Sequence, residues 1–229
     1  MDRLIGRECG LGRRAVREVL AAGEVRVGGE VERDGAREVG RFVRVEVGEN
    51  VVRDRTGRYV MVHKPAGVVG ATVDDEHRTV VELVDRVWAG ELHLAGRLDR
   101  STSGLVVLTN DSEFSEGLTR PEAKVGKVYL VETDSEIPRD AVEAFREGMW
   151  FAKEAVRTQP AVVEMLGERR CRLTIYEGKH HQVKRMFLRF GIRVVGLHRE
   201  AVGHLSLEGL NSGEWRELRR EEIGEVIDL

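Results

Sequence analysis

The stretch GRLDRSTSGLVVLTND (residues 96–111) places a single carboxylate, Asp99, between Arg97 and Arg100 and just ahead of a run of apolar residues. The run LVVL (residues 105–108) has the pattern of a strand that is buried on both faces of a sheet. Such a strand fixes the preceding loop rigidly. A carboxylate held there by Arg97 or Arg100 stays ionised and can act as a nucleophile or a general base. The alternative is an Arg–Asp ion pair that only stabilises the loop.

Outward from this stretch, strand patterns alternate with helical patterns along most of the chain. Strands are expected within residues 59–69, 105–109, 127–132, 160–165, 171–176 and 192–197, and helices around 79–87, 138–148 and 180–190. This mixture predicts an α+β domain over residues 59–229, built on a sheet with both faces partly covered. The polar segment VVRDRTGR (residues 51–58) contains a glycine and is predicted to be a linker.

Residues 1–50 are expected to form a small separate domain. Apolar residues at helical spacing predict a helix that stops at Gly23, and the alternation around Gly28-Gly29 predicts two strands joined by a tight turn. On the face of the helix opposite the apolar one lie three arginines, Arg13, Arg14 and Arg17. This basic face is a candidate RNA contact, and an ordinary solvated helix face is the alternative.

The composition limits the class of protein. At 229 residues the chain is long enough for one large and one small domain, and 41% hydrophobic with 34% charged residues indicates a globular protein with a densely ionic surface. No long apolar run is present, so we expect a cytoplasmic protein without a membrane partner. The two cysteines lack CxxC spacing, which argues against a disulfide scaffold or a zinc knuckle. The net charge of −3 leaves a polyanionic partner open, because binding depends on where the cations lie.

The segment KVYLVE (residues 127–132) carries a candidate aromatic group. Strand alternation puts Lys127, Tyr129 and Val131 on one face of the sheet, so Tyr129 can present its ring to a base or another substrate. A tyrosine in such a position is more often simply part of the core.

The segment YEGKHHQVKRMFLRFG (residues 176–191) predicts a helix with an apolar stripe and a separate cationic face. His181, Lys184 and Arg185 lie together on that second face, which suits binding of phosphate or RNA. No HExxH motif or set of carboxylate and histidine ligands accompanies the histidines, so we expect no metal site.

Taken in order, GRLDRSTSGLVVLTND, KVYLV and EGKHHQVKRMF resemble the three signature segments of bacterial rRNA pseudouridine synthases. Further similar segments are HKPAGVV (residues 63–69), LHRE (197–200) and GEWRELRREEI (213–223). Residues 1–50 resemble the S-four-type (alpha-L) RNA-binding domain that many of these enzymes carry in front of a larger mixed-sheet catalytic domain. HQVKRMF and LHRE are most similar to the branch that acts on small-subunit (16S) rRNA.

The resemblance implies an isomerase that converts a specific uridine of 16S rRNA to pseudouridine. Isomerisation involves no redox change and no net hydrolysis, so no cofactor or metal is expected. The implied partner is ribosomal RNA or a small-subunit assembly intermediate, and the enzyme is expected to be a monomer. Of the catalytic residues, Asp99 is the aspartate, Tyr129 the active-site tyrosine and Lys184 the cation near the aspartate. Many relatives have arginine in place of Lys184, so Arg185 remains the alternative. The expected RNA contacts are Arg13, Arg14, Arg17, Arg97, Arg100, His181, Gln182 and Arg185.

Three other functions remain open from the sequence alone. The first is a pseudouridine synthase that acts on 23S rRNA. The second is a non-catalytic rRNA-binding assembly protein, in which Asp99 only stabilises its loop; it would bind RNA without isomerising it. The third is a nucleoside or glycoside hydrolase that uses Asp99 and releases a free base or leaves an abasic product.

Overall fold

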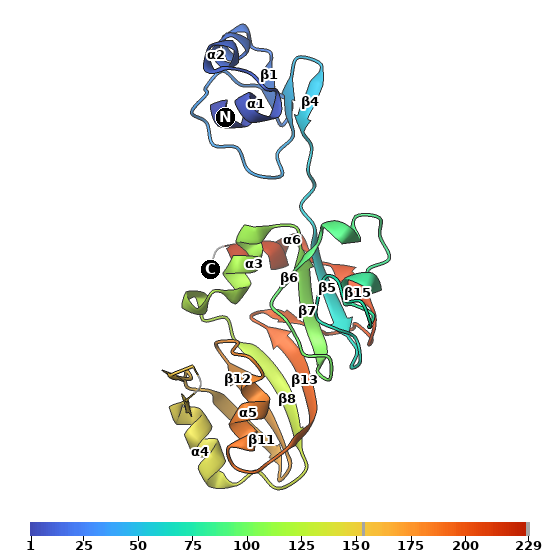
Figure 1. Ribbon diagram of the computed structural model, residues 1–229, viewed down its shortest axis with the longest axis vertical. Helices are drawn as coiled ribbons and strands as arrows, with labels where there is room; N and C mark the ends of the chain where they lie inside the picture. Colours follow the sequence, from blue (N-terminus) through green and yellow to red (C-terminus); the bar gives the residue numbers. More distant parts are fainter. Residues whose placement is uncertain (153, 228–229) are drawn as a thin grey trace. The chain divides into compact units, whose positions relative to one another are not determined.

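The computed structural model describes residues 1–152 and 154–227, which divide into two compact units, Met1–Gly57 and a larger one that begins at Arg58. The helices and strands of the first unit (Figure 1) are α1 (Asp2–Glu8), α2 (Arg13–Ala22), β1 (Val25–Val27), β2 (Glu30–Val31), β3 (Val45–Val47) and β4 (Asn50–Arg53). The four strands form an antiparallel sheet in the order β2-β1-β3-β4.

The first unit is held together by a small apolar core between its helices and its sheet. Ile5, Val16, Leu20 and Val25 are each at most 3% exposed. The predicted helix end at Gly23 is confirmed, because Gly23 has a φ of 73° and its amide donates to the Leu20 carbonyl. A left-handed residue at this position is the usual way to end a helix, and glycine adopts it without steric cost.

The expected linker 51–58 starts too early. Val51–Arg53 belong to β4 and pair antiparallel with β3. Every residue of β4 is exposed or half-buried, so the polar composition that suggested a linker is that of an exposed edge strand. Residues 54–58 form neither helix nor strand.

The second unit is built on a nine-stranded mixed sheet (Figure 1). The path β11-β12-β8-β13-β7-β5-β15 forms most of it, with β14 added beside β13 and β6 beside β7. The strands are β5 (Tyr59–Lys64), β6 (His93–Ala95), β7 (Ser103–Thr109), β8 (Lys127–Thr133), β11 (Val162–Gly167), β12 (Arg170–Ile175), β13 (Val194–Val202), β14 (Leu205–Ser206) and β15 (Trp215–Glu217), and a separate pair is β9 (Trp150–Phe151) with β10 (Val156–Arg157). Only the pairing of β13 with β7 is parallel among the described strand pairs.

Helices cover both faces of this sheet. They are α3 (Ser112–Thr119), α4 (Arg139–Glu147), α5 (Gln182–Leu188) and α6 (Arg220–Ile227). On one face α4 and α5 pack through Phe145 and Phe187, and on the other α3 packs through Phe114 and Leu118 beside α6. The central strand β7 is buried on both faces, as the LVVL run predicted. Helix α3 packs on one face, and the other face belongs to the apolar cluster that includes Val80, Val81 and Leu83. No helix among the described residues is long and apolar enough to span a membrane.

The prediction of a helix around residues 79–87 is wrong. Only a single 3₁₀ turn, η1 (Val81–Leu83), forms there. Val80, Val81, Leu83 and Val84 are buried in the core, whereas Val87 is exposed. The buried residues reach the core from an irregular chain, in which Val69 bridges to Thr79. Three β-branched valines in five residues lower the helix propensity. The burial of these valines in the core therefore outweighs the weak helical preference, and the chain is irregular.

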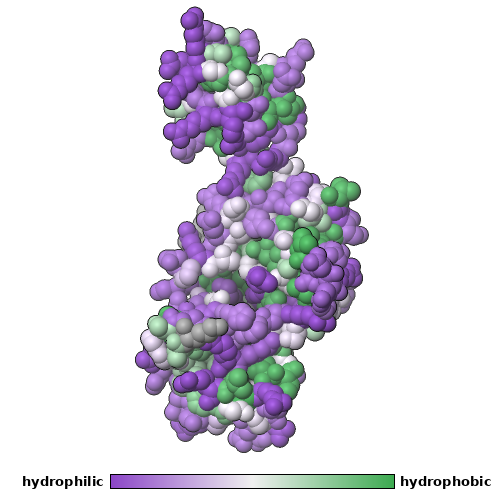
Figure 2. Space-filling model, viewed as in Figure 1, coloured by the Kyte–Doolittle hydropathy of each residue, from purple (hydrophilic) through white to green (hydrophobic). Residues whose placement is uncertain are grey.

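The basic face of α2 predicts an RNA-binding phenotype. Arg13, Arg14 and Arg17 are all exposed, Arg14 pairs only with the exposed Glu18 on its own helix, and much of the first unit's visible surface is hydrophilic (Figure 2). Replacing all three by Gln should weaken binding to rRNA and lower the slope of log affinity against log salt, by about 0.7 for each phosphate of single-stranded RNA that is no longer neutralised. A salt titration of binding measures this, with turnover at saturating RNA as the control. If this slope were identical for the variant and the parent, the arginine face of α2 would be an ordinary solvated surface that does not contact RNA.

Candidate active site

Asp99 lies in the loop between β6 and β7, here called the aspartate loop (residues 96–102). The loop leaves β6 at Gly96, whose φ of 87° turns the chain sharply. The Thr102 amide then donates to the Asp99 carbonyl at 3.0 Å, which closes a turn directly before β7. The buried strand and this turn together fix the direction in which the aspartate points.

A second loop, residues 65–70, is fastened to the aspartate loop. The Gly67 amide donates to the Arg100 carbonyl at 2.8 Å, and the Arg100 side chain donates back to the Gly67 carbonyl at 3.3 Å. Arg97 donates to the Gly70 carbonyl at 3.0 Å. The backbones touch at Gly70, where a Cβ would lie 2.3 Å from the Leu98 carbonyl oxygen, so only glycine fits.

These contacts correct the sequence interpretation of the two flanking arginines. The sequence predicts that Arg97 or Arg100 holds the carboxylate of Asp99, but each arginine donates from Nε to a backbone carbonyl of the other loop. The two guanidinium groups therefore join the loops to each other instead of pairing with the carboxylate between them. Both arginines remain exposed at the surface.

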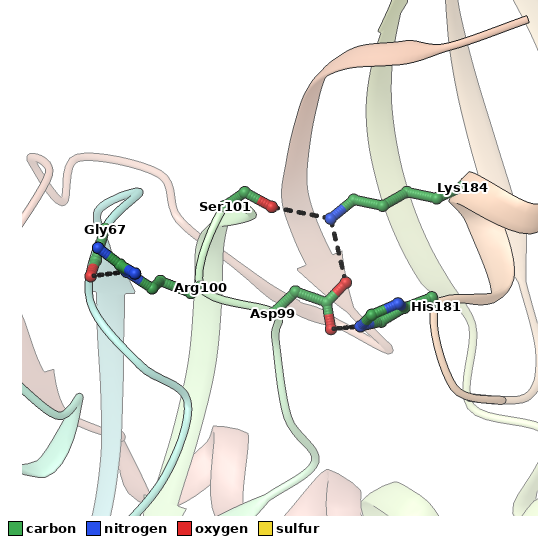
Figure 3. Close-up of a pocket in the computed structure, with 6 residues that line it drawn as sticks. All are labelled: Gly67, Asp99, Arg100, Ser101, His181 and Lys184. Carbon is green, nitrogen blue, oxygen red and sulfur yellow. Dashed lines mark hydrogen bonds and ion pairs between the residues drawn. The ribbon is translucent and has the colours of Figure 1, made fainter. Parts of the chain in front are cut away.

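The partners of Asp99 come from α5 and the residue before it (Figure 3). Lys184 Nζ lies 3.2 Å from Oδ2, and His181 Nε2 lies 3.2 Å from Oδ1. Lys184 Nζ also donates to the Ser101 hydroxyl at 2.8 Å. Each carboxylate oxygen therefore faces a different nitrogen, and the lysine is held from two directions. Of Lys184 and Arg185, Lys184 lies within ion-pair distance of Asp99, and Arg185 pairs with Glu154 instead.

His181 occupies an unusual backbone conformation. Its φ of 49° is left-handed, which is uncommon for a residue other than glycine. Its ring stacks on His180 at a centroid distance of 3.8 Å while its Nε2 faces Asp99. The strained backbone turns the imidazole toward the carboxylate.

A pocket of about 480 Å³ opens beside the carboxylate (Figure 3). Small-molecule sites commonly measure roughly 300–1,000 Å³, so the space suits a group of the size of a nucleotide. It is lined by Gly67, Asp99, Arg100, Ser101, His181 and Lys184.

Tyr129 lies in the core rather than in the wall of this pocket. It is 7% exposed and packs in the apolar cluster on the face covered by α4 and α5. As expected, it shares a sheet face with Lys127 and Val131, all three being buried. Its hydroxyl lies 3.5 Å from Nη1 of Arg199, a buried arginine on β13.

Two residues expected to contact RNA have partners within the protein. Arg185 forms two hydrogen bonds of 2.7 Å to Glu154 and lies over the ring of Phe151, and the bond to Glu154 raises the pKa of Arg185. Gln182 is 3% exposed and donates to Glu177 at 2.8 Å. The helical pattern placed Arg185 off the apolar stripe, but it could not show that a carboxylate 31 residues earlier would pair with it.

Sequence reasoning missed a set of buried cations near the aspartate loop. Lys64 is fully buried and donates to the Val68 carbonyl at 2.7 Å and the Arg100 carbonyl at 3.5 Å, so it fastens the two loops from within. Burial lowers its pKa to about 8. The signal was a lysine at the end of the apolar strand YVMVHK, where a long cationic side chain normally reaches solvent.

Comparison with known proteins shows which family has this sequence and fold. Residues 58–189 match the family described as RNA pseudouridylate synthase. The chain belongs to this family. The ribosomal small subunit pseudouridine synthase A of Pseudomonas aeruginosa is 44% identical over 228 residues, which cover 99% of either chain. The protein of that name from Escherichia coli strain K12 is 39% identical over 229 residues, again 99% of both.

Solved structures agree with the sequence relatives. A crystal structure of a pseudouridylate synthase is similar with a TM-score of 0.72 and 35% identity, and the match covers 98% of both chains. The family resemblance of the three signature segments and the α+β fold that it implied are therefore confirmed. The segment that matches the family includes Asp99, Tyr129 and Lys184.

The two neighbouring cations of α5 allow a matched comparison. Lys184→Met removes the nitrogen that faces Asp99 Oδ2 and should slow the chemical step by about tenfold or more, equivalent to about 1.4 kcal/mol of barrier. Lys184→Arg keeps the charge and should retain much of the rate. Arg185→Met removes a pair with Glu154 instead and should leave the chemical step nearly unchanged. Single-turnover rates at saturating RNA measure all three, and a slow Arg185→Met beside a normal Lys184→Met would reverse the assignment.

Lys127 predicts a pH dependence of stability. Burial, followed by repulsion from Arg199, lowers its pKa from 10.5 to about 8. Between these pH values the unfolded chain binds more protons at this site than the folded one, so the contribution of Lys127 to stability rises with pH. Lys127→Met should therefore be more stable than the parent at pH 7, and the gap should narrow as the pH approaches 10.

Urea unfolding at pH 7, 8, 9 and 10 measures the free energy of unfolding of both proteins. Lys124→Met replaces an exposed lysine of the same unit and serves as the control, for which the gap should not change with pH. A constant gap for Lys127→Met would show that Lys127 titrates alike in the folded and unfolded chains.

Proposed function

We propose that this chain isomerises a uridine of small-subunit ribosomal RNA to pseudouridine, with Asp99 as the catalytic carboxylate and Lys184 as its charge partner. One observation carries the proposal: the two oxygens of a single loop carboxylate face Lys184 and His181 at the wall of an open pocket. The near full-length likeness to small-subunit pseudouridine synthases supports the choice of RNA.

The reaction needs little beyond a positioned carboxylate. The bond between N1 of uracil and C1′ of the ribose breaks, the base turns over, and C5 bonds to C1′. N1 ends with a proton and C5 loses one, so no atom is gained or lost. A carboxylate assists the cleavage by attack or by proton abstraction. Lys184 fixes one oxygen of Asp99 and His181 faces the other, so the carboxylate is oriented at the wall of the pocket in which the nucleotide would lie.

The uridine has to leave its stack to reach this pocket. We propose that the exposed Arg97 and Arg100 hold the RNA backbone beside the loop, and that His181, directly before α5, contacts the nucleotide. Tyr129, which does not line the pocket, is proposed to support the site from within the core. Residues 1–50 are proposed to bind RNA as a separate domain through the arginines of α2.

The proposed setting follows from the substrate. The enzyme would act in the cytoplasm as a monomer, on ribosomal RNA or on a small-subunit assembly intermediate, and without a cofactor. The relatives are named for the small subunit, which favours that RNA over the RNA of the large subunit.

Asp99→Asn tests the proposal. The change removes the charge and keeps the shape, so pseudouridine formation should be lost while rRNA affinity stays within about twofold. The readout is pseudouridine at single-nucleotide resolution in small-subunit rRNA, together with a binding titration. Asp75→Asn, which changes an exposed aspartate of the same unit, is the matched control and should be fully active.

The other candidate functions give different products in this assay. Substantial pseudouridine from Asp99→Asn contradicts the catalytic assignment. Free uracil or an abasic site from the parent protein indicates a hydrolase. Binding without any product, in the parent as in the variant, indicates an assembly protein, and modification confined to large-subunit rRNA contradicts the proposed substrate.

A further inference from the structure

Arg199 on β13 lies directly behind the aspartate loop. It is 3% exposed, and its backbone pairs with Tyr129 of β8 on one side and with Gly104 of β7 on the other. The chains approach so closely that a Cβ on Gly104 would lie 2.3 Å from the Arg199 carbonyl oxygen. This arginine is therefore built into the sheet beside the strand that follows Asp99.

The guanidinium of Arg199 reaches both ends of the aspartate loop. Nε donates to the Leu105 carbonyl at 2.7 Å, just after the loop, and Nη1 donates to the Arg97 carbonyl at 3.4 Å, near its start. Nη1 also lies 3.5 Å from the Tyr129 hydroxyl. One planar group thus spans the loop that carries the carboxylate and the tyrosine of the proposed site.

A contribution to folding stability does not explain why an arginine is buried at position 199. Among the described residues, no carboxylate lies within ion-pair distance of the Arg199 guanidinium, and its Nη2 is buried without a hydrogen-bond partner. Arg199 also repels the buried Lys127 and Lys64. An unpaired buried charge and an unmet donor both oppose folding. A buried donor without a partner in a native structure calls for an explanation other than stability.

We propose that Arg199 is a positioning residue for the isomerisation. It holds the two ends of the aspartate loop and the Tyr129 hydroxyl in one fixed arrangement, so that Asp99 meets Lys184 and the nucleotide together. This inference rests on the proposed role of Asp99. It assigns to Arg199 no contact with the RNA.

Arg199→Lys keeps the positive charge but replaces a planar group that reaches three oxygens by a single nitrogen. Misplacing a catalytic group by about 1 Å can cost about a hundredfold in rate. We therefore expect the single-turnover rate to fall by tenfold to a hundredfold, with RNA affinity within about twofold of the parent. Arg199→Ala should lose more, and millimolar guanidinium chloride should restore part of its rate where equal sodium chloride does not.

Arg216→Met is the matched control for simple loss of stability. Arg216 is a partly buried arginine on β15 of the same sheet, but it pairs with Glu222 of α6 rather than with the aspartate loop. This variant should melt at a lower temperature, yet its folded fraction should react at the normal rate. Melting temperature, RNA affinity and single-turnover rate are measured for every variant.

A rate within twofold of the parent for folded Arg199→Lys overturns the inference. The inference also fails if the rate loss of Arg199→Lys is explained by its unfolded fraction alone, as is expected for Arg216→Met. It fails as well if guanidinium does not rescue a folded Arg199→Ala. If Arg199→Ala does not fold, Arg199→Lys decides alone. Asp99→Asn is assayed in parallel: if it forms pseudouridine, the proposed function fails, and if it is inactive while Arg199→Lys is normal, only this inference fails.

Discussion

The hydrogen bonds that join residues 65–70 to the aspartate loop are the constraint on which the site depends. Gly67 and Arg100 bind each other in both directions, and Lys64 holds the same carbonyl from within the core. These bonds tie the end of β5 to the start of β7, two neighbours in the sheet. The carboxylate of Asp99 is consequently rigid before any substrate arrives, and α5 only has to bring Lys184 and His181 to it. Preorganisation of this kind lowers the cost of reaching the reactive geometry.

The arginines and lysines of the second unit divide into two kinds by their partners. Arg172 and Arg185 pair with carboxylates at the surface, where an ion pair contributes little to stability. Lys64 and Arg199 instead donate to backbone carbonyls in the interior. Carbonyl oxygens fix a cation without neutralising it, so the region behind the aspartate loop stays positive. This positive potential stabilises the negative charge of the Asp99 carboxylate and attracts the negatively charged phosphates of the RNA substrate.

The sequence predicted the parts of the molecule that follow from periodicity and from turn residues. The LVVL run predicted β7, Gly23 predicted the end of α2, and the signature segments predicted that Asp99 and Lys184 belong to one site. The failures have specific physical causes. Val51–Arg53 form an exposed edge strand whose composition is that of a loop, and the valines near η1 are buried without a helix. The partners of Arg97 and Arg185 depend on contacts between distant segments, which no local pattern contains.

The parallel pairing of β13 with β7 bears on the order in which the chain folds. Ser103 and His198 are joined across it although they are 95 residues apart in the sequence. Contacts between residues so far apart in the sequence have a high entropic cost of loop closure and form late. The contacts within residues 1–57 close smaller loops and can form earlier. Because β13 leaves the ribosome after most of the chain, we expect a nascent chain to acquire its first unit long before β13 can pair with β7. Pulse-labelled hydrogen exchange on refolding chains should then show amides of β1 and β3 protected before those of residues 103–104. If the first unit binds RNA as proposed, a chain still being synthesised would bind RNA before it can modify it.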